Sequence, residues 1–148
     1  MTSSNDRYRI KQLSIFSENR PGRLMDIARA MKEEKVNILG FTIAEGMGYG
    51  VVRALVDHPK KAYDKLVKEG FIVQFTDVLA VRMEDAPGGL YDLTTVLGAA
   101  GINIEYAYGY SMPPGAVLIV KVEQVEKGIE VLQKNDRLLL DTSHFTHD

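Results

Sequence analysis

Cysteine and tryptophan are absent from this chain of 148 residues, and histidine occurs only three times. Without cysteine the protein has no disulfide, no thiolate metal ligand and no cysteine nucleophile. His58, His144 and His147 are not spaced as a metal-ligand cluster, so we expect neither a metal nor a cofactor. No apolar run approaches the roughly 18 residues of a membrane-spanning helix, and residues 1–6 are polar, which predicts a cytoplasmic protein without a membrane partner.

Concentrated positive charge is also lacking. The formal net charge is −2, and lysine and arginine form no block. Nucleic-acid backbones bind clustered positive charge, so we expect no direct nucleic-acid partner. Hydrophobic residues make up 45% and charged residues 26%, which is typical of a soluble globular protein.

One loop sequence is present twice. Residues 18–24 read ENRPGRL, and residues 84–90 read EDAPGGL, 66 positions later (84 minus 18). Each copy lies between a strand-like run and a helix-like run. This arrangement indicates one small structural unit built twice, with two versions of one candidate site.

The first half follows the order βαββαβ. Alternating apolar residues predict a strand over 8–16, and the spacing of Leu24, Ile27 and Met31 predicts the helix after it. Strands over 38–43 and 51–56 flank a glycine-rich hairpin at 46–50. Pro59 marks the start of a second helix, and the last strand covers 71–75.

The second half keeps the same register. Strands are predicted over 78–83, 102–104, 117–122 and 138–140, with a hairpin at 111–115. Helices are predicted from Leu90 to Leu97 and over 124–133. We therefore predict an α+β protein of two ferredoxin-like units, 7–76 and 77–141, each an antiparallel sheet with helices on one face. Residues 1–6 and 142–148 are predicted to be polar tails.

The two loops, each followed by an Asn-Ile pair at the next strand, resemble the ACT domain. Residues 18–24 and 36–38 match its pattern well, and residues 84–90 and 102–104 match it more loosely. The resemblance covers roughly residues 9–140 and is closest to stand-alone tandem ACT proteins. It implies a regulatory, allosteric protein without enzymatic activity, which binds a free amino acid between ACT domains and forms a homodimer.

The chemistry of the first loop suits an amino acid zwitterion. The Pro21-Gly22 turn exposes backbone N–H groups at a helix start, which is an anion site. Asn19 and Asn37 each carry a donor and an acceptor, and we expect the two amides to converge. In serine-sensing dehydrogenases the matching asparagines hold the ligand together with a histidine; Ser17 replaces that histidine here and argues against serine.

The resemblance thus assigns candidate ligand-binding residues to both copies. They are Asn19, Arg20, Pro21, Gly22, Arg23, Leu24, Asn37 and Ile38 in the first copy, and Asp85, Ala86, Pro87, Gly88, Gly89, Leu90, Asn103 and Ile104 in the second. An aspartate accepts hydrogen bonds only and repels a carboxylate. We therefore expect unequal sites, with the Asn19 site the better one. Gly89 in place of Arg23 is expected to open space.

Several alternatives stay open at this stage. Arg20 and Arg23 are interpreted as solvated rather than ligand-binding. Tyr106, Tyr108 and Tyr110 form one aromatic strand face, which suits a cover for the sheet, a dimer contact or a stacking surface for a ligand. A regulatory interaction subunit with a vestigial ligand site is the second functional hypothesis. The pattern does not fix which amino acid binds, and no nucleophile with an adjacent base favours an enzyme.

Overall fold

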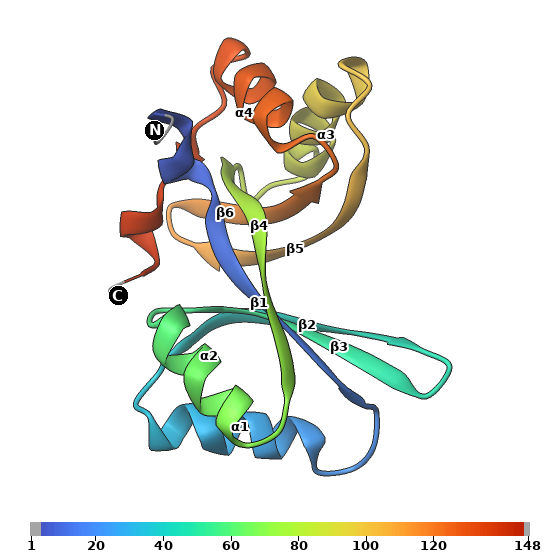
Figure 1. Cartoon of the computed structure of the whole chain (residues 1–148). Coiled ribbons are helices and arrows are strands. Elements are labelled where there is room, and N and C mark those ends of the chain that lie inside the picture. The colour runs from blue at the N-terminus through green and yellow to red at the C-terminus, as the bar shows by residue number, and fades with distance from the viewer. Residues whose placement is uncertain (1–3, 147–148) are drawn as a thin grey trace. The chain divides into compact units, whose positions relative to one another are not determined.

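The computed structural model describes residues 4–146, in which strands and helices alternate as predicted (Figure 1). Four α-helices accompany seven strands, and two short 3-10 helices lie near the ends of the chain. The elements are η1 Ser4–Tyr8, β1 Ile10–Glu18, α1 Arg23–Glu33, β2 Ile38–Gly46, β3 Tyr49–Val56, α2 Pro59–Lys68, β4 Ile72–Met83, α3 Gly89–Ala99, β5 Ile104–Met112, β6 Gly115–Val122, α4 Val125–Lys134, β7 Leu139–Leu140 and η2 Thr142–His144.

The chain forms two compact units. The first contains Lys11–Thr76 and the residues from Phe145 onward, and the second contains Asp77–His144 and the residues up to Ile10. In the first unit the strands lie in the order β2-β3-β1-β4, and in the second unit β6 lies between β4 and β5 while β7 pairs with β4. The pairs that define these sheets are antiparallel. The predicted pair of ferredoxin-like α+β units is therefore confirmed.

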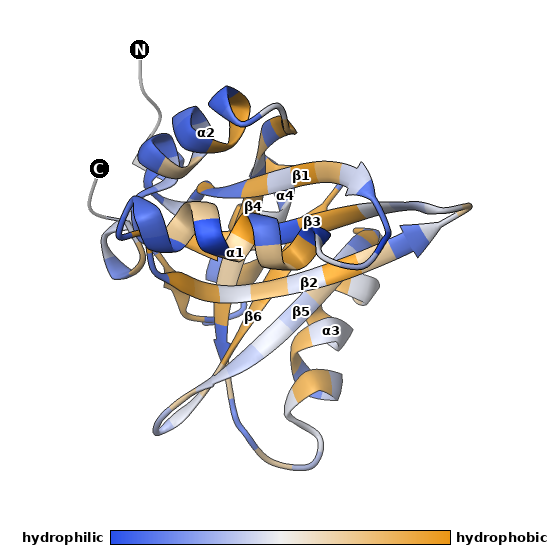
Figure 2. Ribbon diagram, turned by 90° about the horizontal axis from the view of Figure 1, so that it is seen from below, coloured by the Kyte–Doolittle hydropathy of each residue, from blue (hydrophilic) through white to orange (hydrophobic). Residues whose placement is uncertain are grey.

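The core of each unit lies between its sheet and its two helices (Figure 1). In the first unit Ile27 and Met31 of α1 and Leu66 of α2 pack against apolar residues of the strands. In the second unit Leu97 of α3 and Leu132 of α4 take the corresponding places. Figure 2 shows the hydrophobic residues concentrated in the strands, whereas hydrophilic residues recur along α1 and α2.

The backbone itself repeats every 66 residues. Left-handed conformations with positive φ recur at Gly22 and Gly88, at Lys35 and Gly101, and at Gly70 and Asp136. Most L-residues avoid this region, so its recurrence at matched positions reflects the same turns in both units. The duplicated sequence therefore encodes a duplicated backbone, including turns whose residue types differ.

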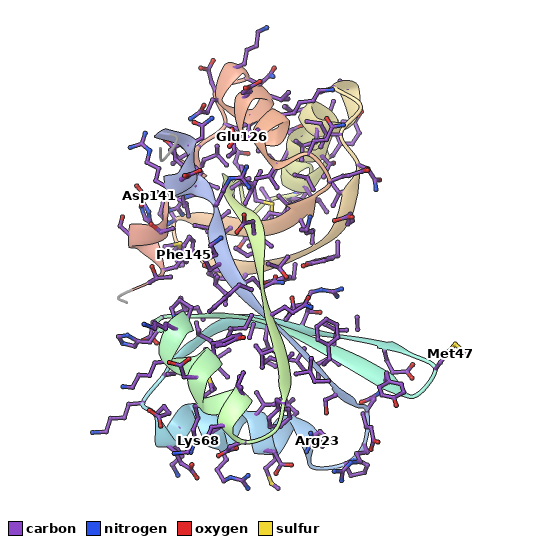
Figure 3. The ribbon with its side chains drawn as sticks, in the orientation of Figure 1. Arg23, Met47, Lys68, Glu126, Asp141 and Phe145 are labelled. Atoms are coloured by element: carbon purple, nitrogen blue, oxygen red, sulfur yellow. The ribbon has the colours of Figure 1, made fainter. Side chains whose placement is uncertain are left out.

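Two features differ from the sequence-based expectation. Strands predicted over 71–75 and 78–83, with a boundary at 76–77, form one continuous strand, β4. Both ends, predicted to be polar tails, contain 3-10 helices, and the Phe145 side chain is only 2% exposed (Figure 3). Period-two alternation does not break at Thr76-Asp77, so the pleat continues through the polar pair.

The N-terminal segment is fixed to α4 of the second unit by polar contacts. Arg9 donates to the carboxylates of Asp77 at 3.1 Å and Glu126 at 2.9 Å, and the Asn5 amide donates to Glu126 at 3.1 Å. The hydrogen bond from Arg9 is the main cause that holds the pKa of Glu126 below its usual value. These contacts explain why a segment expected to be a tail has a defined helical turn.

The aromatic strand face is half-buried. Tyr106, Tyr108 and Tyr110 lie on β5, opposite Lys121, Ile119 and Val117 of β6. That face is turned away from α3 and α4, because the alternate β6 residues form the core beneath those helices. Burial raises the pKa of the Tyr110 hydroxyl. The tyrosines thus contribute to the interior rather than to an exposed stacking surface.

Candidate functional site

The first predicted loop connects β1 to α1 and ends at a glycine cap. Gly22 is the N-cap residue, with φ of 90°, and no side chain caps the helix. Before it, the backbone N–H of Asn19 donates to the Gly48 carbonyl at 2.9 Å, which fixes the loop against the β2–β3 hairpin. A helix start without a side-chain cap keeps its first N–H groups available to an anion. The loop geometry therefore suits a carboxylate.

Arg23 is built into this loop rather than solvated, contrary to the sequence interpretation. Its Nε donates to Ser17 Oγ at 2.9 Å, and its Nη1 lies 3.4 Å from the Asp26 carboxylate. Its guanidinium carbon lies 4.4 Å from the centre of the Phe71 ring, in cation–π geometry. The three contacts hold the positive charge in one orientation. Arg20 is more open, with 58% of its side chain exposed and an ion pair to Glu18 at 3.3 Å.

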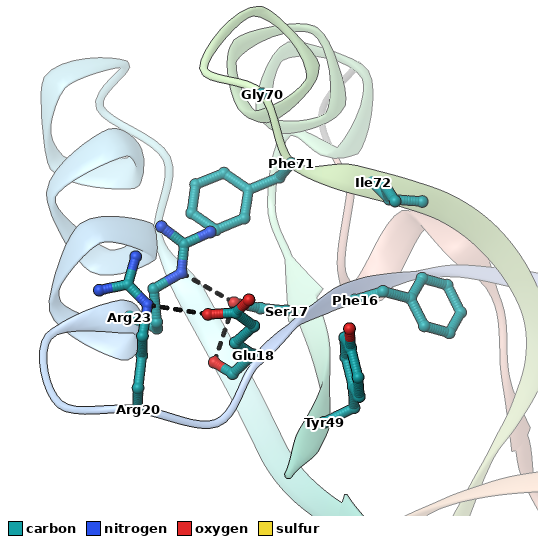
Figure 4. Close-up of a pocket in the computed structure, with 9 residues that line it drawn as sticks. All are labelled: Phe16, Ser17, Glu18, Arg20, Arg23, Tyr49, Gly70, Phe71 and Ile72. Atoms are coloured by element: carbon teal, nitrogen blue, oxygen red, sulfur yellow. Dashed lines mark hydrogen bonds and ion pairs between the residues drawn. The ribbon is translucent and has the colours of Figure 1, made fainter.

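Two hollows flank the first loop. The smaller, of about 120 Å³, lies between the loop, the start of α1 and β2, and its lining includes Asn19, Gly22, Leu24, Met25 and Ile43. The larger, of about 310 Å³, lies where the end of β1 separates from the start of β4 (Figure 4). Its lining residues are Phe16, Ser17, Glu18, Arg20, Arg23, Tyr49, Gly70, Phe71 and Ile72.

The expected convergence of Asn19 and Asn37 within one unit is wrong. The end of β1 lies at the β2–β3 hairpin, because Glu18 and Gly46 both pair with Tyr49. Asn37 precedes Ile38, which pairs with Val56 at the other end of the sheet. The nine residues of β2 separate the two amides by roughly 25 to 30 Å at about 3.3 Å per residue.

The second loop borders a hollow of about 470 Å³ at the same place in its own unit. Candidate residues Asp85 and Ala86 line it, whereas Asn103 and Ile104 lie at the far end of β5, as Asn37 and Ile38 do in the first unit. Most of its lining matches the larger hollow of the first unit when 66 is added to each number. The residues are Arg82, Met83, Glu84, Asp85, Ala86, Pro114, Gly115, Asp136 and Arg137.

Charge distinguishes these two matched hollows. The first contains two arginines and one glutamate, a formal charge of +1 (2 minus 1). The second contains two arginines and three carboxylates, a formal charge of −1 (2 minus 3). Its arginines are occupied by backbone carbonyls, with Arg82 donating to Met112 at 2.7 Å and Arg137 to Asp92 at 3.3 Å. The first hollow is therefore the better environment for an anion.

Gly89 does not open space, contrary to expectation. A Cβ at this position would lie 2.2 Å from the carbonyl oxygen of Glu84, so the backbone of the second loop fills the room that a side chain would need. Arg23, at the matched position, has a side chain. The two loops share their Pro-Gly turn but differ in how closely the following residue approaches the strand.

Phe16, Tyr49, Phe71 and Ile72 line the larger hollow but escaped the sequence analysis. Each belongs to a strand or follows a helix as an ordinary apolar residue, and its role arises from tertiary contact alone. The ring of Phe71 beside Arg23 has no local signal, since 48 positions (71 minus 23) separate the two. The available signal was the 66-residue comparison, which pairs Phe71 with the polar Arg137.

Within residues 4–146, His, Asp and Glu side chains form no group of three or more that would hold a metal ion. Across the same residues, every helix is too short or too polar to cross a bilayer.

The two ferredoxin-like units, each with a Pro-Gly loop at a glycine-capped helix, define a paired regulatory module. The sequence model of the ACT domain pair matches residues 8–146. The chain therefore belongs to the ACT domain pair family. No curated protein sequence matches it.

Solved structures agree with this assignment. The crystal structure of protein BT0572 from Bacteroides thetaiotaomicron is 35% identical, covers 92% of this chain and 94% of its own, and superimposes with a TM-score of 0.87. The regulatory subunit of aspartate kinase from Thermus thermophilus, in a ligand-free form, is 12% identical, with coverage of 86% and 94% and a TM-score of 0.62. The corresponding subunit from Thermus flavus is 15% identical, with coverage of 85% and 90% and a TM-score of 0.60. The two Thermus structures share the fold.

Proposed function

We propose that this ACT domain pair is a non-enzymatic regulatory protein that binds a free amino acid at the β1–α1 loop. The observation that carries the proposal is the start of α1, where a glycine N-cap leaves the helix without a side-chain cap beside Asn19. The ligand carboxylate would accept hydrogen bonds from the first turn of α1, and the Asn19 amide would bind its polar groups. A bound ligand would favour one arrangement of ACT domains, which a partner protein would recognise.

One loop supplies only part of such a site. The hollow beside Asn19, about 120 Å³, is smaller than the roughly 300–1,000 Å³ of most small-molecule sites. An amide such as that of Asn37 cannot complete the site from within the same unit, because it lies at the other end of the sheet. We therefore place the ligand at an interface between ACT domains, where a second domain provides the missing wall.

A thermal-shift screen of the full chain against the common amino acids tests this function. A ligand at about 100 times its dissociation constant adds roughly 2.7 kcal/mol to stability, and the melting temperature rises accordingly. Asn19→Ala is expected to abolish most of the shift, and Asp85→Ala to have less effect, because a carboxylate at position 85 repels the ligand carboxylate. No shift with any amino acid, or calorimetry with two equal and independent sites, would contradict the proposal.

An apolar strip on the first unit favours a homodimer or a partner protein as the second domain. Leu24 and Met25 of α1 are 39% and 65% exposed, and Phe41 and Ile43 of the edge strand β2 are 50% and 44% exposed. The matched β5 residues in the second unit are Ala107 and Gly109. Exposed apolar side chains gathered on one face are typical of protein contacts. This strip also supports the alternative function, a regulatory interaction subunit with a vestigial ligand site.

Replacing Phe41 and Ile43 together by serine is expected to shift a dimer to monomers, because the apolar area that drives association is removed. Light scattering after size-exclusion chromatography measures the mass. The matched control is Leu138→Ser, which removes an exposed side chain from the second unit. A monomeric wild-type protein that binds an enzyme or regulator without responding to any amino acid would favour the interaction subunit.

A further inference from the structure

The larger hollow of the first unit combines a fixed positive charge with exposed aromatic walls, and neither the Asn19 site nor the core of the fold requires this combination (Figure 4). We propose that this hollow is a separate ligand site for a small carboxylate with an aromatic or large apolar side chain. It differs in location and in lining from the smaller hollow beside Asn19, so the proposal goes beyond the amino-acid site at the loop.

Arg23 provides the carboxylate-binding end. Its contacts with Ser17, Asp26 and Phe71 fix the guanidinium before any ligand arrives, so little conformational freedom is lost on binding. A guanidinium has five N–H groups, and the bonds to Ser17 and Asp26 engage Nε and Nη1. Capacity to donate to a carboxylate therefore remains. Arg20, at the rim beside Glu18, adds a second positive charge.

Three large side chains from three strands provide the apolar end. Phe16 of β1, Tyr49 of β3 and Ile72 of β4 are 37%, 67% and 68% exposed. All three line the same hollow, whose volume of about 310 Å³ lies at the lower end of the range for small-molecule sites. An aromatic ring placed there would remove these side chains from water and stack on Phe16 or Tyr49.

The second unit has a matched hollow in which this chemistry is lost. Phe16 corresponds to Arg82, Tyr49 to Gly115 and Arg23 to Gly89. The aromatic walls are therefore absent, and the three carboxylates of Glu84, Asp85 and Asp136 oppose an anion. One site per chain is expected, although the backbone is duplicated.

The guanidinium has moved between elements in the two units. In the first, Arg23 of α1 stacks on Phe71 and pairs with Asp26. In the second, the position of Phe71 is taken by Arg137, which donates to the backbone of Asp92, the counterpart of Asp26. Only the first arrangement leaves an aromatic ring beside the charge, so selectivity for a carboxylate with an apolar side chain resides in the first unit.

Calorimetry or NMR titration of the full chain with 3-phenylpropionate tests the site, with phenylalanine and the uncharged 3-phenylpropionamide as comparisons. We expect one equivalent of the carboxylate to bind and the amide to bind about 10- to 100-fold more weakly, since the charged hydrogen bonds are lost. Equal affinities of phenylalanine and 3-phenylpropionate would show that the amino group is not recognised. A much tighter fit for phenylalanine would assign Glu18 to its ammonium. Both outcomes keep the carboxylate and the ring as the recognised parts.

Ile72→Glu is the decisive variant, because Ile72 is exposed and the change places a negative charge in the hollow without altering the core. It is expected to weaken binding at least about tenfold, whereas Leu138→Glu, the same change at the matched position, leaves the affinity unaltered. Tyr49→Ser gives a second test that removes a wall. No binding of 3-phenylpropionate at millimolar concentration, or equal effects of both glutamate variants, would overturn the proposal.

Asn19→Ala separates this proposal from the amino-acid site at the loop. In that variant 3-phenylpropionate is expected to keep its affinity even where an amino-acid shift is lost. Loss of 3-phenylpropionate binding in Asn19→Ala, with Ile72→Glu unaffected, would assign the compound to the loop site and overturn the separate site.

Discussion

Replacing Leu132 by alanine is expected to lower the free energy of unfolding by about 2–5 kcal/mol. Leu132 lies on α4, is fully buried, and belongs to the core of the second unit. The substitution removes buried apolar surface and leaves a cavity that a close-packed interior fills only in part. Urea denaturation followed by circular dichroism measures the loss, and hydrogen exchange should show reduced protection first in α3 and α4.

Leu66→Ala is the matched change in the first unit, 66 residues earlier, and its expected loss is similar. Leu66 is fully buried within a core cluster whose residues all come from the first unit. Its effect on hydrogen exchange should appear first in α1 and α2. Leu138→Ala serves as the control, because this side chain is 59% exposed and little burial is lost. A loss below about 1 kcal/mol for either core variant would contradict the packing described above.

The second large effect is expected for Gly89→Ala, at the start of α3. The new Cβ would lie 2.2 Å from the carbonyl oxygen of Glu84, well inside contact distance with a backbone atom that cannot rotate away. Overpacking of this kind costs typically about 1–3 kcal/mol, and the loop must shift to relieve it. Thermal denaturation measures the destabilisation, and NMR shift changes should be largest between residues 84 and 90.

Gly98→Ala in the same helix is the natural control. A Cβ at Gly98 would meet nothing within 4 Å, and alanine favours a helix by about 0.5–1 kcal/mol over glycine. The two glycine-to-alanine changes are therefore expected to have opposite signs. Destabilisation of similar size at both positions would mean that helix propensity, rather than the close approach to Glu84, governs the effect.

The sequence predicted the order of the elements because each has a local cause. The spacing of Ile27 and Met31 indicates a helix, Pro59 begins one, and Gly22 and Gly88 mark the turns before two others. These causes are repeated at a distance of 66 residues, which is why both units were recognisable. The merging of two predicted strands into β4 was missed, because Thr76 and Asp77 resemble a turn in composition although the pleat continues through them.

The candidate site was predicted less completely. The loop positions were found, but Asn37 was misplaced because α1 carries the chain from one end of the sheet to the other. Its 11 residues span roughly 16 Å at 1.5 Å per residue, so the residues before and after it cannot meet. The wall of the larger hollow formed by Phe71 depends on the packing of α2 and β4, and no neighbouring residue in the sequence indicates it.

The exchange of chain ends between the units has a consequence for how this protein can be dissected. Residues up to Ile10 belong to the second unit, and those from Phe145 onward belong to the first. A gene fragment that starts at codon 77 would therefore encode Asp77 and Glu126 without Arg9, their common ion-pair partner. Neither unit corresponds to one uninterrupted stretch of the gene. Recombination that shuffles whole ACT domains would have to cut this gene twice to move either unit intact, although its sequence repeats in tandem.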